Sequence, residues 1–260
     1  MEYKAVLIDL DDTLVVEEQS ADLSFQKSAG YLKQLYNIDE QDFVLSVKSS
    51  AKELWYELPT IKYAQQIGIA SREALWADFS EDNDDQKLLK KYKKFYQTKT
   101  WINALLAYNI NDEKLASVLS SIFINDRRNR HVLFDDSLEF LKQLKKQKLN
   151  TGLITNGTPD LQWQKIKKSG IENFFNVITI SGEAGYKKPS AEIFLNCLKK
   201  LNSETNESVM VGNNIMTDIK GANELGICSV WLNRDKTENE TGIVPDYEVN
   251  SLYEVMYILQ

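Results

Sequence analysis

The sequence predicts an α/β protein whose parallel β-sheet is interrupted, directly after its first strand, by an all-helical insert. Glycine and proline divide the chain into two parts. Two of the 11 glycines and one of the four prolines lie between residues 15 and 134, and the others all lie after residue 134. In the later part short apolar segments alternate with helical ones, whereas the earlier part shows helical spacing throughout. One further strand-like segment opens the chain.

The segments that predict strands are short and rich in β-branched residues. They are residues 4–8 (KAVLI), 150–155 (NTGLIT), 176–181 (NVITIS), 208–212 (SVMVG) and 228–232 (CSVWL). Helices are expected at about residues 135–148, 160–169, 190–202 and 216–225. Strands that alternate with helices predict a parallel sheet with right-handed crossovers. We therefore assign residues 1–14 and 135–260 to one discontinuous core.

The insert is predicted to be a separate helical domain of residues 15–134. Apolar residues recur there at helical spacing, as at Leu32, Leu35 and Tyr36. Polar breaks such as residues 80–86 and 109–113 separate these segments. We expect five or six helices in this domain.

Composition excludes several classes of partner. The formal net charge of −7 argues against binding to nucleic acid or to an anionic membrane. No apolar run approaches the roughly 18 residues of a membrane helix, and no leader precedes the first strand.

Cys197 and Cys228 form no CxxC pair, and we expect both to be buried thiols in a reducing compartment. We expect a cytosolic monomer or homodimer.

Polar residues follow four of the five predicted strands. Because ligand sites in parallel sheets form beyond the carboxyl ends of the strands, these residues are expected to lie together. They are Asp9, Asp11, Asp12 and Thr13; Thr155, Asn156 and Gly157; Lys187, Lys188 and Pro189; and Asn213, Asn214 and Asp218. Each group alone could serve as a helix cap or a turn, but four such groups on one sheet are hard to assign to capping.

Several kinds of catalytic site can be excluded because the residues that they require are missing from the sequence. His131 is the single histidine, and no GxSxG sequence is present, so a Ser-His or Cys-His nucleophile is not expected. P-loop, HExxH and clustered-cysteine signatures are also missing from the sequence. Oxygen ligands suited to Mg²⁺ remain, with a carboxylate that could itself be the nucleophile. Such a set suits attack on a phosphate monoester, where a cation and a lysine offset the negative charge.

Four motifs, in order, resemble those of the haloacid dehalogenase superfamily of phosphatases. They are VLIDLDDTL, LITNG, GYKKP and VGNNIMTD, and they span the predicted core. The resemblance implies a Rossmann-like core with a helical cap inserted between the first and second motifs. It also implies that the cap closes over the site and selects the substrate.

The resemblance implies a role for each matching residue. Asp9 would be the nucleophile that becomes phosphorylated, and Asp11 would be the general acid and base. Thr155 would hold the phosphoryl group, together with backbone N–H groups at Asn156 and Gly157. Of the two adjacent lysines, Lys188 matches the family position beside the proline and would also contact the phosphoryl group.

The metal site implied by the resemblance differs from the usual family pattern at one residue. Mg²⁺ would be held by Asp9, the backbone carbonyl of Asp11, Asn213 and Asp218. The family usually has Gly-Asp where this chain has Gly212 and Asn213. An amide keeps a carbonyl oxygen in place but removes one negative charge, so we expect a functional but weaker Mg²⁺ site.

The motifs predict a Mg²⁺-dependent phosphatase that hydrolyses a small phosphorylated metabolite, and other readings stay open. A metal-independent dehalogenase could carry Asn213, although Asp11 favours a phosphatase because a leaving alcohol needs a proton. A phosphomutase shares the same chemistry, and a catalytically weakened protein could bind a phosphorylated ligand. A two-component receiver is remote, since its acids lie on the first and third strands of a small domain without an insert.

The sequence indicates less clearly which residues of the predicted cap contact the substrate. Arg127, Arg128 and Arg130 could meet an anionic substrate, but surface salt bridges are the favoured interpretation. Three tryptophans could stack on a base or sugar, but core packing is favoured. They are Trp55, Trp76 and Trp101.

Overall fold

The structure, a computed structural model, describes residues 3–259 and divides into two compact units. The first contains the chain up to Val16, residues 132–157 and the chain from Lys165 onward; the second contains residues 17–131 and 158–164. Residues 158–164 were assigned to the core from the sequence, and the structure groups them with the helical unit. The reason is tertiary contact: the Asp160 carboxylate accepts the backbone N–H groups of Asp78 and Phe79, and Leu161 joins the helical core.

The first unit contains a parallel sheet with the strand order β3-β2-β1-β4-β5-β6 among the described residues. The strands are β1 (Ala5–Ile8), β2 (Asn150–Thr155), β3 (Val177–Ile180), β4 (Ser208–Gly212), β5 (Cys228–Leu232) and β6 (Tyr247–Val249). The first five confirm the predicted strands to within one residue at each end. Strand β6 was not predicted, because it is only three residues long and two of them are exposed.

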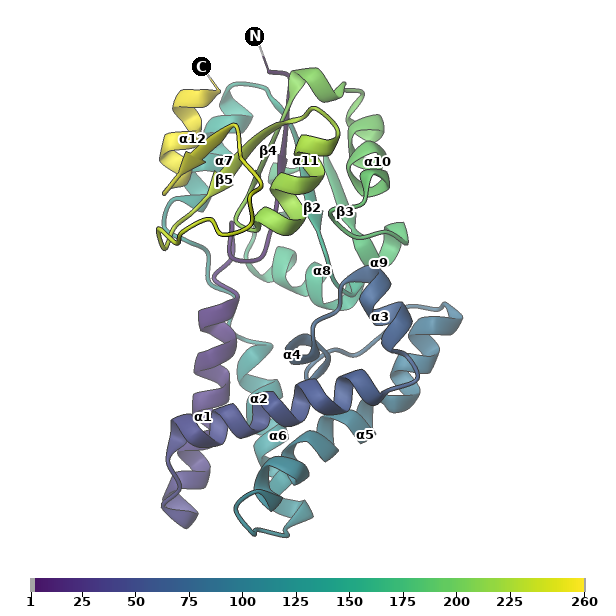
Figure 1. Cartoon of the computed structure of the whole chain (residues 1–260), viewed down its shortest axis with the longest axis vertical. Helices are drawn as coiled ribbons and strands as arrows, with labels where there is room; N and C mark the ends of the chain where they lie inside the picture. Colours follow the sequence, from purple (N-terminus) through teal and green to yellow (C-terminus); the bar gives the residue numbers. More distant parts are fainter. Residues whose placement is uncertain (1–2, 260) are drawn as a thin grey trace. The chain divides into compact units, whose positions relative to one another are not determined.

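Helices cover both faces of this sheet (Figure 1). All four residues of β1 are buried, and neighbouring residues of a strand point to opposite faces, so neither face is open. The helices of this unit are α7 (Ser137–Lys146), α9 (Ser181–Ala184), α10 (Ala191–Leu201), α11 (Lys220–Glu224) and α12 (Leu252–Ile258). Helix α8 (Pro159–Lys168) begins in the second unit and ends in the first. Helix α7 contacts α12, and α10 contacts α11 and packs on β2 and β3. On that face Leu7, Ile154 and Met210 share a core with Phe194 and Leu198.

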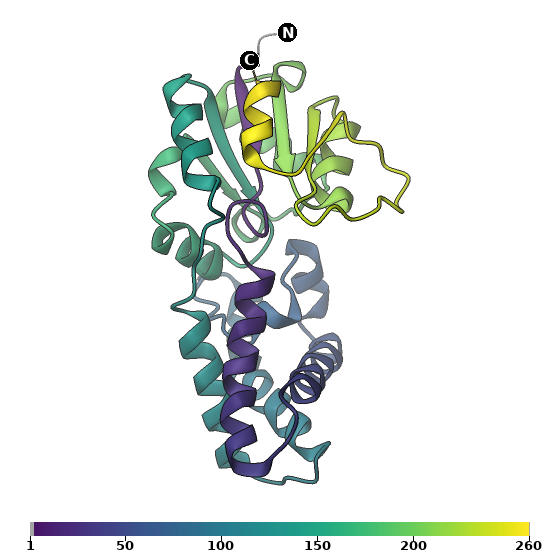
Figure 2. The same ribbon diagram turned by 90° about the vertical axis from the view of Figure 1, so that its left-hand side faces the viewer.

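The second unit is all-helical, as predicted. Its six helices are α1 (Glu18–Tyr36), α2 (Glu40–Glu57), α3 (Ile61–Ile67), α4 (Ser71–Ala74), α5 (Asp84–Leu106) and α6 (Glu113–Arg127). Side chains of Asp39, Asn83 and Asp112 cap three of them by accepting backbone N–H groups of the first turn. Figure 2 shows α1 and α6 side by side, and these two helices pack along their length. No helix among residues 3–259 is long and apolar enough to cross a membrane.

The tryptophans of the second unit belong to its core, as the sequence interpretation favoured. Trp55, Trp76 and Trp101 are all buried, and the Trp101 ring lies 5.9 Å from Phe123 and 6.4 Å from Phe25, centroid to centroid. This cluster gives the helical unit an apolar core independent of the sheet.

The three arginines at the end of the helical unit form ion pairs within it. Arg128 pairs with Asp78 at 2.6 Å and Arg130 pairs with Asp126 at 2.9 Å, which confirms the favoured interpretation for these two. For Arg127 a surface salt bridge was the wrong expectation, because its side chain is fully buried and pairs with buried Glu17. Its guanidinium also lies 4.7 Å from the centroid of the Trp76 ring.

Candidate active site

The strand order brings three of the predicted motifs to one edge of the sheet. Strand β1 lies between β2 and β4, and Ile8 is in register with Leu153 and Val211. The residues that follow these three strands therefore meet at their carboxyl ends. Every predicted catalytic, substrate-binding and metal-binding residue lies in the first unit.

Lys188 lies between two buried carboxylates. Its Nζ atom is 2.5 Å from Asp9 Oδ1 and 2.8 Å from Asp218 Oδ1. Lys188 is 2% exposed, Asp9 6% and Asp218 0%. One ammonium thus connects the end of β1, the third motif and the turn after β4, while the group as a whole carries one excess negative charge.

Burial and charge shift the pKa of both Asp9 and Lys188. Burial raises the pKa of Asp9 to about 6; Lys188 opposes this rise, and the nearby Asp218 carboxylate adds to it. For Lys188, burial lowers the pKa, but Asp218 and Asp9 outweigh it and hold the value above its ordinary range. Lys188 therefore remains charged at neutral pH, and Asp9 ionises less readily than a surface carboxyl.

Gly212 permits the close approach of Asp218 to the end of β4. A Cβ atom at residue 212 would collide with the Asp218 carboxyl group. The chain then forms a π-helical turn, Ile215–Ile219, that returns Asp218 toward the strand. Asn214 caps this turn by accepting the N–H groups of Met216 and Thr217, so its amide has a local structural role.

Thr13 connects Asp9 to Asn213. Its hydroxyl lies 3.0 Å from Asp9 Oδ2 and 3.3 Å from Asn213 Oδ1, and it accepts the Asn213 N–H at 3.1 Å. The Asn213 carbonyl accepts the indole N–H of Trp231 at 2.9 Å. The amide oxygen of Asn213 is therefore held beside the predicted nucleophile.

Arg234 fixes the backbone of Thr13. Its guanidinium donates to the Thr13 carbonyl at 3.0 Å and pairs with both oxygens of Asp136 at 2.8 and 3.0 Å. The same guanidinium lies 3.9 Å from the centroid of the Phe134 ring. Asp136 also accepts the backbone N–H of Leu252, which connects this network to α12.

The second motif holds the third in place. The Asn156 side chain accepts the Lys188 N–H at 2.8 Å and donates to the Lys188 carbonyl at 3.2 Å. The Gly157 N–H donates to Ser181 Oγ at 2.8 Å, and Gly157 has a φ of +138° that favours glycine. Buried Thr155 ends β2 beside Ile180 of β3. Substrate binding by these residues stays a prediction.

Asp11 pairs with a buried lysine that the motifs did not indicate. Lys165 Nζ lies 2.9 Å from both Asp11 Oδ1 and Asp11 Oδ2. The Lys165 side chain is fully buried, whereas that of Asp11 is 22% exposed. The candidate site thus has two buried lysines, each paired with different carboxylates.

Comparison with known proteins places the whole arrangement in a family. Residues 3–226 match the family of haloacid dehalogenase-like hydrolases. The chain belongs to this family. The hydrolase is 32% identical over 253 residues to phosphoserine phosphatase of Thermus thermophilus, with 97% of each chain covered.

Two solved structures have a similar fold. The magnesium-bound HAD-hydrolase YfnB of Bacillus subtilis matches with a TM-score of 0.67 and 22% identity over all of both chains. The 2-haloacid dehalogenase of Pseudomonas syringae matches with a TM-score of 0.60 and 21% identity, over 99% of this chain and 98% of that one. The predicted family and the predicted fold class, a parallel core sheet with an inserted helical domain, are confirmed.

The donor groups of this hydrolase fit a magnesium ion. All four predicted ligands offer oxygen, and Mg²⁺ is usually bound through one or two carboxylates while it keeps several waters. Within residues 3–259 no group of three or more His, Cys, Asp or Glu side chains is arranged to hold a metal. The predicted set does not need one, because Asn213 would contribute an amide oxygen and Asp11 a backbone carbonyl.

Sequence reasoning did not identify the contacts that Thr13 and Lys165 make with Asp9 and Asp11. Thr13 was given no role of its own from the sequence, although its spacing of four residues from Asp9 could have indicated a contact. Lys165 lies among several lysines, but it follows Leu161 by four residues and therefore shares the buried face of α8. A lysine on an apolar helix face is the signal that could have identified it.

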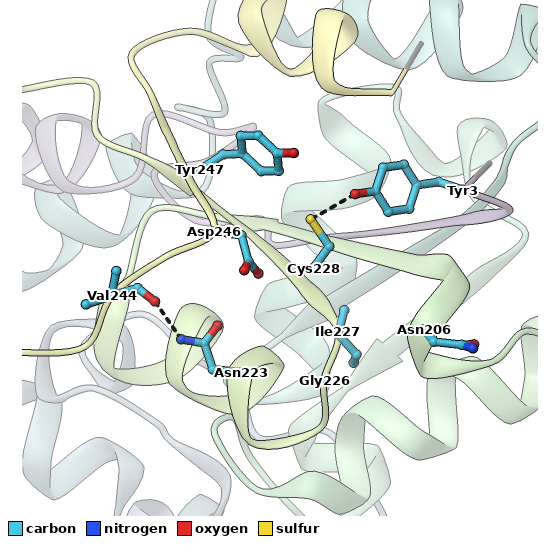
Figure 3. Close-up of a pocket in the computed structure, with 9 residues that line it drawn as sticks. All are labelled: Tyr3, Asn206, Asn223, Gly226, Ile227, Cys228, Val244, Asp246 and Tyr247. Carbon is cyan, nitrogen blue, oxygen red and sulfur yellow. Dashed lines mark hydrogen bonds between the residues drawn. The ribbon is translucent and has the colours of Figure 1, made fainter. Parts of the chain in front are cut away.

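A separate cavity of about 550 Å³ lies at the amino ends of β4, β5 and β6, away from the candidate site (Figure 3). It is lined by residues that include Tyr3, Cys228 and Asp246, and the Tyr3 hydroxyl donates to Cys228 Sγ at 3.3 Å. Cys228 is half-buried rather than buried as expected, while Cys197 is fully buried. Burial raises the pKa of both thiols, to about 11 for Cys197, so neither is an activated nucleophile.

Replacing Lys188 by methionine is expected to lower the free energy of unfolding by about 3–5 kcal/mol, because Asp9 and Asp218 would remain buried without their cation. Urea denaturation in EDTA measures this loss. The matched control, Lys187→Met, should change the value by less than about 0.5 kcal/mol. Equal losses in the two variants would contradict the central role of Lys188.

In the metal-free protein, the contribution of Asp9 to the free energy of unfolding is expected to fall as the pH rises from about 4 to about 7. The pKa of Asp9 is about 6 in the folded protein and about 3.9 in an unfolded chain, so folding favours the protonated acid. Asp9→Asn removes this penalty, and its stability relative to the wild type should increase by about 3 kcal/mol over that pH range. Urea denaturation in EDTA at several pH values gives the difference, and a pH-independent difference would refute the prediction.

Proposed function

We propose that this hydrolase is a Mg²⁺-dependent phosphatase that forms an aspartyl-phosphate on Asp9 and acts on a small phosphorylated metabolite. The observation that carries the proposal is Asp11, a second acid two residues after Asp9 in the same loop. Cleavage of a phosphate ester releases an alcohol that needs a proton, whereas release of a halide does not. Kinship with phosphoserine phosphatase supports hydrolysis of phosphate monoesters.

The first step transfers the phosphoryl group to the enzyme. An oxygen of the Asp9 carboxylate attacks phosphorus while the bond between phosphorus and the ester oxygen breaks. Asp11 gives its proton to that oxygen, so the alcohol leaves neutral and Asp11 becomes a carboxylate.

The second step returns the enzyme to its starting state. The Asp11 carboxylate takes a proton from water, and the water oxygen attacks phosphorus. The bond between phosphorus and Asp9 breaks, which releases inorganic phosphate, a free Asp9 carboxylate and protonated Asp11.

The other residues of the site supply charge and orientation. Lys188, held by Asn156 and Asp218, offsets negative charge where Asp9 meets the phosphoryl group. Thr155 and the N–H groups near Asn156 would hold the phosphoryl oxygens. A Mg²⁺ ion on Asp9, the Asp11 carbonyl, Asn213 and Asp218 would supply further positive charge.

A dehalogenase is the second candidate function, because Asn213 departs from the usual acid and the fold is shared with a 2-haloacid dehalogenase. A phosphomutase would use the same first step and pass the phosphoryl group to a second alcohol. A protein that only binds a phosphorylated ligand has no need of both Asp9 and Asp11, which favours an active enzyme.

The purified protein is expected to hydrolyse p-nitrophenyl phosphate when Mg²⁺ is present and to lose this activity in EDTA. Asp9→Asn should lower kcat by about 10³-fold or more, because no nucleophile remains. Asp12→Asn makes the same substitution three residues later, at a left-handed residue that asparagine tolerates, and should retain activity. Metal-independent halide release from a 2-haloacid would instead identify a dehalogenase, and no turnover of either compound would favour a binding protein.

Asn213→Asp is expected to lower the Mg²⁺ concentration for half-maximal activity by about tenfold, because affinity rises with ligand charge. In EDTA the same variant should melt at a lower temperature than the wild type, since a further carboxylate would face Asp9. Asn214→Asp is the matched control, because an aspartate at this exposed cap keeps the acceptor oxygen. If both variants responded to Mg²⁺ like the wild type, Asn213 would not be a metal ligand.

A further inference from the structure

Lys165 is a fully buried lysine on α8 whose charge the proposed reaction does not yet use. Its neighbours Lys167 and Lys168 on the same helix are exposed, so burial is specific to residue 165. A buried ammonium loses its hydration and is tolerated only with a close anionic partner. Here the partner is the acid that the proposed reaction requires.

The contact between Lys165 and Asp11 orients the carboxylate as well as neutralising it. The ammonium is equidistant, at 2.9 Å, from the two carboxylate oxygens. It therefore bridges the carboxylate and opposes rotation about the side-chain torsion that turns the carboxyl plane. A carboxylate has about four lone-pair positions, and this bridge uses one on each oxygen, so proton exchange at another position stays compatible with it.

The backbone beneath Asp11 is already fixed by other contacts. The N–H groups of Leu14 and Val15 both donate to the Leu10 carbonyl, and the Asp12 N–H donates to the Val15 carbonyl at 2.8 Å. These hydrogen bonds close the loop after β1 and fix the backbone from which the Asp11 side chain extends. The Lys165 ammonium, which contacts both carboxylate oxygens, constrains where the Asp11 carboxylate points.

The two buried lysines of the site divide the carboxylates between them. Lys188 binds the predicted nucleophile Asp9 together with Asp218, whereas Lys165 binds Asp11. With separate cations, Asp11 does not compete with Asp9 for Lys188. The nucleophile and the acid/base can therefore hold different orientations although only one residue separates them.

We propose that Lys165 is a positioning residue that holds the Asp11 carboxylate where it exchanges protons with the leaving alcohol and with the attacking water. This inference rests on the proposed phosphatase function. A buried ion pair by itself adds little stability compared with apolar side chains, so stability alone does not account for an ammonium at this place. Misplacement of a catalytic group by about 1 Å is enough to cost about 10²-fold in rate.

The consequence is a dependence of the rate on the leaving group. An alkyl alcohol needs the Asp11 proton when its bond to phosphorus breaks, whereas 2,4-dinitrophenolate is stable as an anion and leaves without one. In the second step, the reactions of both substrates need the Asp11 carboxylate to activate water. Loss of Lys165 should therefore slow the first step for an alkyl phosphate and leave that step nearly intact for the dinitrophenyl ester.

The test compares Lys165→Met with the wild type on β-glycerol phosphate and on 2,4-dinitrophenyl phosphate, with Mg²⁺ present. For the alkyl ester kcat should fall by about 10²-fold or more, with KM changed by less than about threefold. For the aryl ester, stopped-flow absorbance should show a burst of one dinitrophenolate per enzyme at a rate near that of the wild type, followed by slow turnover. Lys165→Arg should recover at least a tenth of the wild-type kcat on the alkyl ester, because a guanidinium also bridges a carboxylate.

Lys168→Met, on the exposed face of α8, is the matched control and should behave as the wild type does. Melting temperatures of all variants show whether they are folded, and Lys165→Gln replaces the methionine variant if that one does not fold. If the substitution slows the burst on the aryl ester as much as kcat on the alkyl ester, and arginine restores neither, Lys165 is merely structural and the inference is overturned. If the wild type hydrolyses neither ester, the proposed function itself fails and the inference falls with it.

Discussion

The buried contact of Lys188 with Asp9 and Asp218 is the interaction on which the rest of the site depends. Two carboxylates removed from water repel each other, and a single ammonium between them makes their burial tolerable. The surrounding structure serves this contact. Asn156 fixes the backbone of Lys188, Gly212 makes room for Asp218, and Thr13 binds the second oxygen of Asp9. Burial raises the pKa of Asp9, and the nearby Asp218 carboxylate adds to this rise.

The sheet topology explains how residues so distant in sequence form this contact. With β1 between β2 and β4, the loops that follow these strands are neighbours although more than a hundred residues of the second unit interrupt the chain after β1. The insert is compatible with the sheet because the second unit has its own buried aromatic core around Trp101. Arg234 and Asp136 add a further constraint from β5 and α12, so the loop after β1 is held from several elements.

Much of the fold and part of the site could be predicted from the sequence, for identifiable physical reasons. Strands β1 to β5 were predictable because they are short segments rich in β-branched residues, whereas β6 has only three residues, two of them exposed. The meeting of Asp9, Lys188 and Asp218 was predictable because motifs follow the strand ends, while their catalytic roles stay predictions. Lys165 was not predicted: its place on the apolar face of α8 distinguishes it from the exposed lysines beside it, but its contact with Asp11 depends on tertiary packing. The same holds for residues 158–164, whose place in the helical unit depends on contacts of Asp160 with a distant turn.

The amide at Asn213 is best understood through the charges around it. Burial raises the pKa of Asp9 and Asp218 adds to this rise, while Lys188 is the one cation that these two carboxylates share in the described contacts. An aspartate at residue 213 would place a third negative group within reach of Thr13 and Asp9, and the repulsion would have to be relieved by metal or by protonation. An amide keeps an oxygen for the metal while it limits that repulsion when no metal is bound. If Asn213 is a metal ligand as proposed, an amide there would lower metal affinity and favour the stability of the metal-free site. The separate pairing of Asp11 with Lys165 would keep the proposed acid/base outside that exchange.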